Sequence, residues 1–106
     1  MVNFADIQKV ARRLGDAAQA ESVILFGSYA RGNSTQNSDV DFLVIAPSKL
    51  PRFKRSRELY QLFKPYFFGM DILVYTPEEV KQDSSNPLSF VASIIKEGKV
   101  VYAQGI

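Results

Sequence analysis

The chain has 106 residues, 46% hydrophobic and 23% charged, which is typical of a soluble globular domain, and we expect residues 1–106 to form a single domain. It has no cysteine and no histidine, which excludes disulfides, thiolate or imidazole metal sites and histidine-based triads. The net charge of +2 is too small to indicate nucleic-acid binding by itself, and no apolar run approaches the ~20 residues of a membrane span, so we expect a cytoplasmic protein.

The first half of the chain predicts one helix and two strands. Apolar residues recur at helical spacing over residues 4–19, and Asn3 can cap that helix. Residues 22–26 form a short continuous apolar run, which is consistent with a buried strand. The polar loop 33–38 then separates this strand from a second one at residues 39–46.

The middle of the chain predicts a helix between two prolines. Pro51 suits a helix start, and Pro65 limits how far the helix extends. The helix would gather four aromatic residues on one face: Phe53, Tyr60, Phe63 and Phe67.

The last third predicts two strands and two helices. A strand at residues 70–75 leads into Thr76, which begins a helix with Pro77 at its first position and Glu79 completing a capping box. Another helix is expected between the cap residue Asn86 and the stop residue Gly98, followed by a strand at residues 99–103. This alternation predicts an α/β fold in which helices pack on a small mixed sheet.

Two aspartates open the second predicted strand. Side chains two residues apart in a strand point to the same face, with α-carbons roughly 6.6 Å apart, so Asp39 and Asp41 would repel each other without a cation. Carboxylate oxygens are ligands that Mg²⁺ prefers, and paired metals suit phosphoryl transfer. The alternative is two solvated aspartates at a strand start, but Asp41 leads directly into an apolar run.

The segment GSYARG, residues 27–32, follows the first strand. Gly27 allows close approach of a ligand to the backbone, and Ser28 offers a hydroxyl and an amide to a phosphate. Arg31 adds a positive charge for phosphate or a carboxylate. The alternative is a tight turn with a surface arginine. The segment is not a P-loop, because no Gly-Lys-Ser/Thr follows.

A third carboxylate, Asp71, stands one residue into the strand at 70–75. If that strand neighbours the one at 39–46, Asp71 lies beside Asp39 and Asp41. It could then bind a metal or accept a proton from an attacking hydroxyl, and it is the best general-base candidate in a chain without histidine.

These residues resemble the nucleotidyltransferase motif G-S-x-A-R-G-x5-S-D-x-D-x-x-V, from a superfamily that shares its fold with DNA polymerase β. The matching positions are Gly27, Ser28, Ala30, Arg31, Gly32, Ser38, Asp39, Asp41 and Val44. Asp71 matches the third carboxylate of that superfamily, and the chain is similar to minimal nucleotidyltransferases, of which the MntA-type antitoxins are the best-known group.

The resemblance implies ATP as substrate, Mg²⁺ as cofactor and transfer of AMP to a tyrosine of a HEPN-type RNase toxin, which silences the toxin. It assigns catalysis and metal binding to Asp39, Asp41 and Asp71. It assigns nucleotide binding to four further residues: Gly27, Ser28, Arg31 and Ser38.

Other interpretations stay open at this stage. The chain could neutralise its partner by binding alone, or it could be a catalytic subunit that transfers nucleotides to RNA or a small molecule. A basic stretch at residues 48–64 is either a solvated helix face or a surface that guides ATP or an acidic partner, and RNA contact is uncertain. Tyr29 could stack on a base or simply pack.

Overall fold

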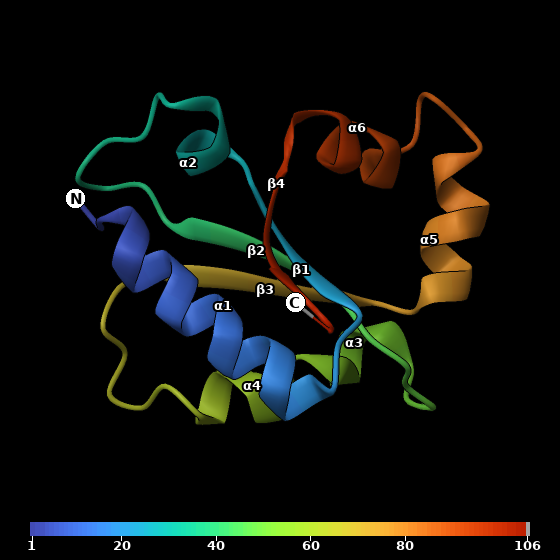
Figure 1. Cartoon of the computed structure of the whole chain (residues 1–106), viewed down its shortest axis with the longest axis horizontal. Coiled ribbons are helices and arrows are strands. Elements are labelled where there is room, and N and C mark those ends of the chain that lie inside the picture. Colours follow the sequence, from blue (N-terminus) through green and yellow to red (C-terminus); the bar gives the residue numbers. More distant parts are fainter. Residues whose placement is uncertain (106) are drawn as a thin grey trace.

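One mixed sheet organises the computed structural model, which describes residues 1–105 (Figure 1). The strands are β1 (Ser22–Phe26), β2 (Val40–Ile45), β3 (Met70–Tyr75) and β4 (Lys99–Ala103), and their order across the sheet is β3-β2-β1-β4. β1 is antiparallel to both β2 and β4, whereas β2 and β3 are parallel. The predicted α/β class and mixed sheet are therefore confirmed.

Helices cover both faces of this sheet. They are α1 (Phe4–Ala18), α2 (Ser28–Arg31), α3 (Arg52–Arg55), α4 (Arg57–Gln61), α5 (Pro77–Ser84) and α6 (Phe90–Glu97). Within residues 1–105, none of the helices is long and apolar enough to cross a membrane.

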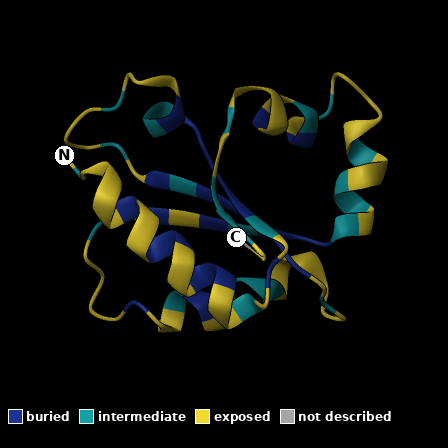
Figure 2. Ribbon diagram, viewed as in Figure 1, coloured by how far each residue is buried: buried dark blue, intermediate teal, exposed yellow. Residues whose placement is uncertain are grey.

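The strand residues alternate between two hydrophobic cores. On one face, Val40, Phe42 and Val44 of β2 pack with buried residues of α1 and α4. On the other face, Leu43 and Ile45 pack with buried residues of α6. Because β2 contributes to both cores, its apolar run is continuous. Figure 2 shows β1 and β2 mostly buried, whereas the edge strand β4 is intermediate or exposed.

The helix ends follow local signals. Asn3 caps α1 by accepting a hydrogen bond from the Asp6 backbone N–H at 2.9 Å, as predicted. Gln19 ends α1 in the left-handed conformation, with φ 51°. The capping box of α5 is also confirmed, since Thr76 and Glu79 exchange side-chain and backbone hydrogen bonds.

The continuous helix predicted after Pro51 is wrong. The chain forms two short helices, α3 and α4, with Ser56 between them. Phe63 is buried and Tyr60 is half-buried, but Phe53 and Phe67 are 80% and 74% exposed. No residue of α3 is fully buried, but the Arg55 side chain is only 8% exposed, and it bonds to Glu79 and to the Val74 carbonyl of β3.

The predicted N-cap of the last helix is also wrong. Asn86 closes a turn, its side-chain oxygen accepting from the Leu88 N–H at 3.0 Å, and α6 begins later. Ser89 is the cap, because its hydroxyl accepts from the Ala92 N–H at 3.0 Å. Both residue types cap helices well, so sequence alone favoured the earlier one.

Candidate active site

The parallel pairing of β2 with β3 places Asp41 directly beside Asp71. Asp41 is half-buried and Asp71 is exposed. The pKa of Asp41 is raised to about 6, mainly by burial, then by a hydrogen bond to Asp71 and by the negative charges of Asp71 and Asp39. The nearby Arg31 lowers this pKa in part. Burial and the neighbouring negative charges thus favour the protonated form of Asp41.

Asp39 lies just before β2 and turns toward the backbone of Gly69, where its carboxylate occupies the space of a missing side chain. The Val40 N–H donates to the Gly69 carbonyl at 3.0 Å and holds these two segments together. In residues 1–105, no three acidic side chains are grouped closely enough to hold a metal ion. The three predicted carboxylates therefore share one end of the sheet without forming a preassembled three-ligand cage.

Gly27 forms the turn between β1 and α2. Its φ of 73° is unfavourable for any residue with a side chain, and a Cβ there would overlap the Asp41 carboxylate. The Gly27 carbonyl accepts from the backbone N–H groups of Ala30 and Arg31, both at 3.1 Å. This turn therefore places Gly27 directly against the Asp41 carboxylate, while ligand binding by Gly27 and Ser28 stays a prediction.

Arg31 forms an ion pair with Glu97 at the end of α6, at 3.2 Å. Both side chains are partly exposed, at 46% and 38%, so the pair adds little stability. The ion pair instead holds the Arg31 guanidinium between α2 and α6. There it is near enough to Asp41 to lower the pKa of that carboxyl group. Sequence reasoning missed Glu97, since the ion pair joins residues 66 positions apart.

Ser38 stabilises the loop that precedes β2. Its hydroxyl accepts from the Thr35 N–H at 2.8 Å, while its own N–H donates to the Thr35 carbonyl at 3.0 Å. These bonds give Ser38 a structural role in placing Asp39. A direct role for Ser38 in nucleotide binding stays a prediction.

The structure adds detail on two tyrosines that the sequence left unresolved or placed only on a helix face. Tyr29 packs against the core, and its hydroxyl accepts from the Val2 N–H at 3.2 Å, so the packing alternative describes it. Tyr60, which was assigned only to a helix face, accepts from the Ile72 N–H at 2.8 Å. Burial and then the charge of Asp71 raise the pKa of Tyr60, and this residue lines the same cavity as Asp39.

Two arginines of the basic stretch lie away from these carboxylates. Arg52 and Arg55 pair with Glu79, and the Arg52 guanidinium stacks 3.9 Å from the centre of the Tyr75 ring. Tyr75 ends β3, whereas Asp71 is near its beginning. At least these two arginines are therefore structural, and they are not placed to guide ATP to the acidic site.

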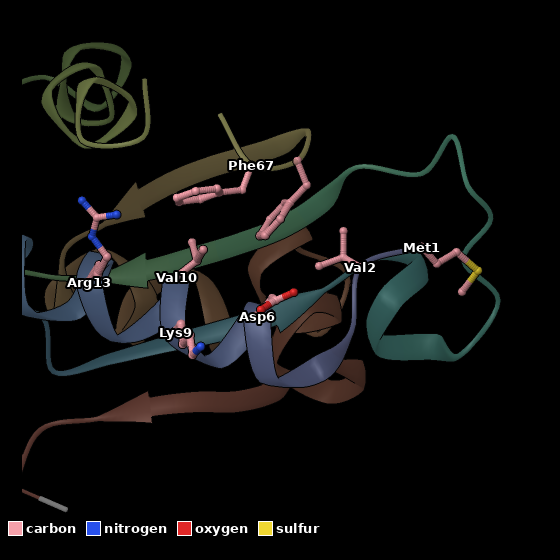
Figure 3. Close-up of a pocket in the computed structure, with 8 residues that line it drawn as sticks. Met1, Val2, Asp6, Lys9, Val10, Arg13 and Phe67 are labelled. Atoms are coloured by element: carbon pink, nitrogen blue, oxygen red, sulfur yellow. The ribbon is translucent and has the colours of Figure 1, made fainter. Parts of the chain in front are cut away.

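Two cavities of about 520 Å³ lie on either side of residues 67–69. One is open beside α1, and within residues 1–105 its lining holds none of the predicted site residues (Figure 3). Its lining residues are Met1, Val2, Asp6, Lys9, Val10, Arg13, Phe67 and Phe68. The other cavity includes Asp39, and it is therefore the one that belongs to the candidate site.

Comparisons with known proteins agree with this geometry. A family model described as "Nucleotidyltransferase domain" matches residues 7–101. The chain is 36% identical over 102 residues to "Putative protein adenylyltransferase MJ1305" of Methanocaldococcus jannaschii. That match covers 91% of this chain and 66% of the relative, so the chain spans slightly less than two thirds of the relative's length.

Solved structures share the fold. A toxin-antitoxin with AMP-PNP aligns with a TM-score of 0.63 at 22% identity, over 92% of this chain and 74% of that one. A mutant of the toxin-antitoxin MntA-HpeT aligns with a TM-score of 0.61 at 21% identity, over 98% and 76% of the two chains. At these identities the likeness is one of fold, and it agrees with the mixed sheet described above.

Proposed function

The chain belongs to the nucleotidyltransferase domain family, and from this membership we propose that it transfers AMP from ATP to a hydroxyl group of a partner protein, with Mg²⁺ as cofactor. The relative named as a protein adenylyltransferase supports a protein acceptor. The toxin-antitoxin neighbours support a toxin as that acceptor. We further propose that the partner is a HEPN-type toxin, that the acceptor is a tyrosine, and that the transfer makes this chain an antitoxin.

The observation that carries the proposal is the pairing of Asp41 with Asp71 beside the Gly27 turn. Their oxygens suit a hard divalent cation, and such an ion would relieve the repulsion that contributes to the raised pKa of Asp41. Asp41 and Asp71 would hold Mg²⁺, and Asp39 would join them only if its side chain turned from Gly69. When bound, the ion supplies charge neutralisation at the phosphates.

The remaining steps fall to the chain's own residues. The Gly27 turn and Ser28 hold the phosphates of ATP, with Arg31 and Ser38 assisting. The acceptor oxygen forms a bond to the α-phosphorus, the bond from that phosphorus to the bridging oxygen breaks, and pyrophosphate leaves. Asp71 takes the proton of the acceptor hydroxyl. Alignment and charge neutralisation provide most of the acceleration in such a reaction.

The test is intact-mass measurement of the protein encoded by the neighbouring gene after incubation with this chain, ATP and Mg²⁺. We expect AMP-sized mass steps on that protein. Asp39→Asn and Asp41→Asn should abolish them while the circular dichroism spectrum is retained. Glu58→Gln, an exposed carboxylate change in α4, is the matched control and should transfer normally.

Two other outcomes have definite meanings. A stable complex of the two proteins without any mass change would replace the proposal with neutralisation by binding alone. No complex and no mass change, with AMP transferred to RNA or a small molecule instead, would make the chain a catalytic subunit for another acceptor.

A further inference from the structure

The sheet has two edge strands, β3 and β4, and they differ in how their outer backbone groups are bonded. At β3, the Ile72 N–H donates to the Tyr60 hydroxyl at 2.8 Å, and the Val74 carbonyl accepts from Arg55 at 3.2 Å. At β4, within residues 1–105, β1 is the only pairing strand and no side chain bonds to the backbone. An unbonded edge is a template for another strand. We propose that β4 pairs with β4 of a second copy of this chain and forms a two-fold symmetric dimer.

The exposed side chains of β4 suit an added strand. Val100 is 64% exposed although it pairs with Ile24 of β1, on the face that α6 covers. In Figure 1, β4 runs between α1 and α6, and no helix crosses over it. Neighbouring strands lie about 4.8 Å apart, so a strand paired with β4 would bring its own side chains against Val100. Pairing would thus bury an apolar side chain and satisfy the free edge together.

A cavity beside β4 adds a second part to this surface. Its volume is about 430 Å³, and it lies between α1 and β4, with Arg12 and Asp16 as its charged lining residues. Both are exposed, and within residues 1–105 neither takes part in an ion pair. The Tyr102 hydroxyl donates to Asp16 at 3.5 Å, and the Tyr102 ring fills the space left by the missing side chain of Gly15. These contacts fix α1 and its charges relative to the edge strand.

The two opposite charges are self-complementary. A two-fold axis through the paired β4 strands reverses the residue order in the second copy and keeps both α1 helices on the same face of the joined sheet. Arg12 of one copy can then pair with Asp16 of the other, twice in each dimer. A partner surface with a single sign of charge would leave one of the two residues unpaired, which favours a second copy as the occupant.

The number of free edges predicts a closed dimer. Because side chains occupy the outer edge of β3, each copy offers one free edge, and pairing of the two β4 strands uses both. Specific interfaces bury about 1,200 Å² or more in total, and a strand of five residues is too short to supply this area alone. The flank of α1 that carries Arg12 and Asp16 is therefore part of the interface.

The experiment is sedimentation velocity of the chain from about 1 to 200 µM, a range that brackets the affinities expected of a small interface. We expect a concentration-dependent shift from monomer to dimer, with no larger species. Hydrogen exchange over the same range locates the contact. The amides of residues 99–103 should become more protected as the dimer forms, whereas those of residues 70–75 should not change.

Charge exchange tests the α1 part of the interface. Arg12→Asp or Asp16→Arg alone would place like charges across the axis, and we expect each to weaken dimerisation by about tenfold or more, because each change occurs twice. The double variant Arg12→Asp with Asp16→Arg should recover dimerisation to within about threefold of the unmodified chain. Lys54→Glu is the matched control, since this exposed charge reversal lies in α3, and it should change dimerisation by less than about twofold.

A substitution at Val100 tests the strand part of the interface. Val100→Lys places a charge on the free edge, and we expect it to weaken dimerisation by about tenfold or more. Leu88→Lys is the matched control, because Leu88 is 93% exposed but lies in the segment before α6, and it should leave dimerisation unchanged. Thermal unfolding at a dilute concentration checks that every variant folds.

Four outcomes would overturn the inference. They are a monomer throughout the concentration range, a dimer without protection of residues 99–103, no recovery in the double charge variant, and protection that appears only after the protein encoded by the neighbouring gene is added. The last result would assign the edge to that protein. The inference does not depend on the proposed function, because β4 and the cavity beside it contain none of the residues assigned to the active site.

Discussion

Among single residues, Asp41 connects the candidate site to the stability of the fold. Its pKa is about 6 in the folded chain against an ordinary value of 3.8, so the folded state favours the protonated form. Protonation of Asp41 stabilises the folded state. This stabilisation is fully present below pH 3.8 and is lost as the pH rises through about 6. At neutral pH, the ionised Asp41 therefore destabilises the protein in the absence of a cation.

This effect predicts that Asp41→Asn stabilises the protein at neutral pH. Because Asp41 is only half-buried, solvent reduces the effect, and we expect a gain of about 1–2 kcal/mol in the free energy of unfolding at pH 7.5. Urea unfolding at pH 4.5 and pH 7.5 measures it, with Glu58→Gln as the control. The explanation fails if the gain from Asp41→Asn is as large at pH 4.5 as at pH 7.5.

Gly27 and Gly32 allow a matched comparison, since both have positive φ angles, 73° and 79°. A Cβ at Gly27 would overlap the Asp41 carboxylate, whereas at Gly32 nothing lies within 4 Å. We expect Gly32→Ala to lower stability by about 1–2 kcal/mol through left-handed backbone strain, and Gly27→Ala to lower it more, because its ψ of −155° lies in a region that essentially only glycine adopts. Only Gly27→Ala should also weaken Mg²⁺-ATP binding by tenfold or more, as measured by calorimetry. A comparable loss of Mg²⁺-ATP binding in Gly32→Ala would mean that backbone strain in the turn, and not the overlap with Asp41, weakens binding.

At the scale of helices and strands, Glu79 joins α3 to α5. The hydrogen bond from Arg55 is the main reason why the pKa of Glu79 is lowered to about 2, and the Thr76 N–H and Arg52 contribute further. A lowered carboxyl pKa stabilises the fold above the ordinary value of 4.5, and this stabilisation is lost as the pH falls through about 2. The ion pair thus fixes α3 to the sheet at neutral pH.

We predict that Glu79→Gln destabilises the protein by about 1 kcal/mol at pH 7, a value kept small because the pair is partly open to solvent. Glutamine can still complete the capping box with Thr76, so this variant removes the charge while keeping the cap. Urea unfolding measures the change. The adjacent exposed carboxylate gives the control, Glu78→Gln, and an equal loss in that variant would point to the charge of α5 in general.

Several expectations that depend on neighbouring residues in the sequence were correct, whereas features that depend on contacts between distant residues were missed. The strand of residues 22–26 and the capping box at Thr76 were predicted correctly, because both depend on neighbours in the sequence. The break between α3 and α4 was missed, because Arg55 takes its place through Glu79, 24 residues later. For the same reason the pairing of Arg31 with Glu97 could not be predicted.

The candidate site shows the same division. The alternation of helices and strands predicted that Asp71 could lie beside Asp41, and the parallel pairing of β2 with β3 confirms this. The direction of the Asp39 side chain was not predictable, since it depends on the missing side chain of Gly69 in another part of the chain. The place of Tyr60 in the cavity that includes Asp39 depends in turn on how α4 packs on the sheet.

In the whole molecule, the aspartate pair of the candidate site and the arginines of α3 lie at opposite ends of the sheet. Asp41 and Asp71 lie where β2 and β3 begin, and α3 contacts β3 near its end through the bond from Arg55 to the Val74 carbonyl. Val74 is three residues beyond Asp71, which corresponds to roughly 10 Å along a strand. Exposed charges at such separations are largely screened at physiological ionic strength, where the Debye length is about 8 Å.

This separation predicts that the basic end contributes little to nucleotide affinity. The double variant Lys49→Glu with Lys54→Glu reverses two exposed charges there, and we expect it to change Mg²⁺-ATP affinity by less than about twofold at 0.15 M salt. Arg31→Gln is the comparison, and it should weaken binding severalfold because its charge already acts on Asp41. Calorimetry on the three proteins decides the question. A tenfold loss in the lysine variant would mean that the basic surface attracts the nucleotide, whereas unchanged ATP affinity with weaker partner binding would assign that surface to the partner.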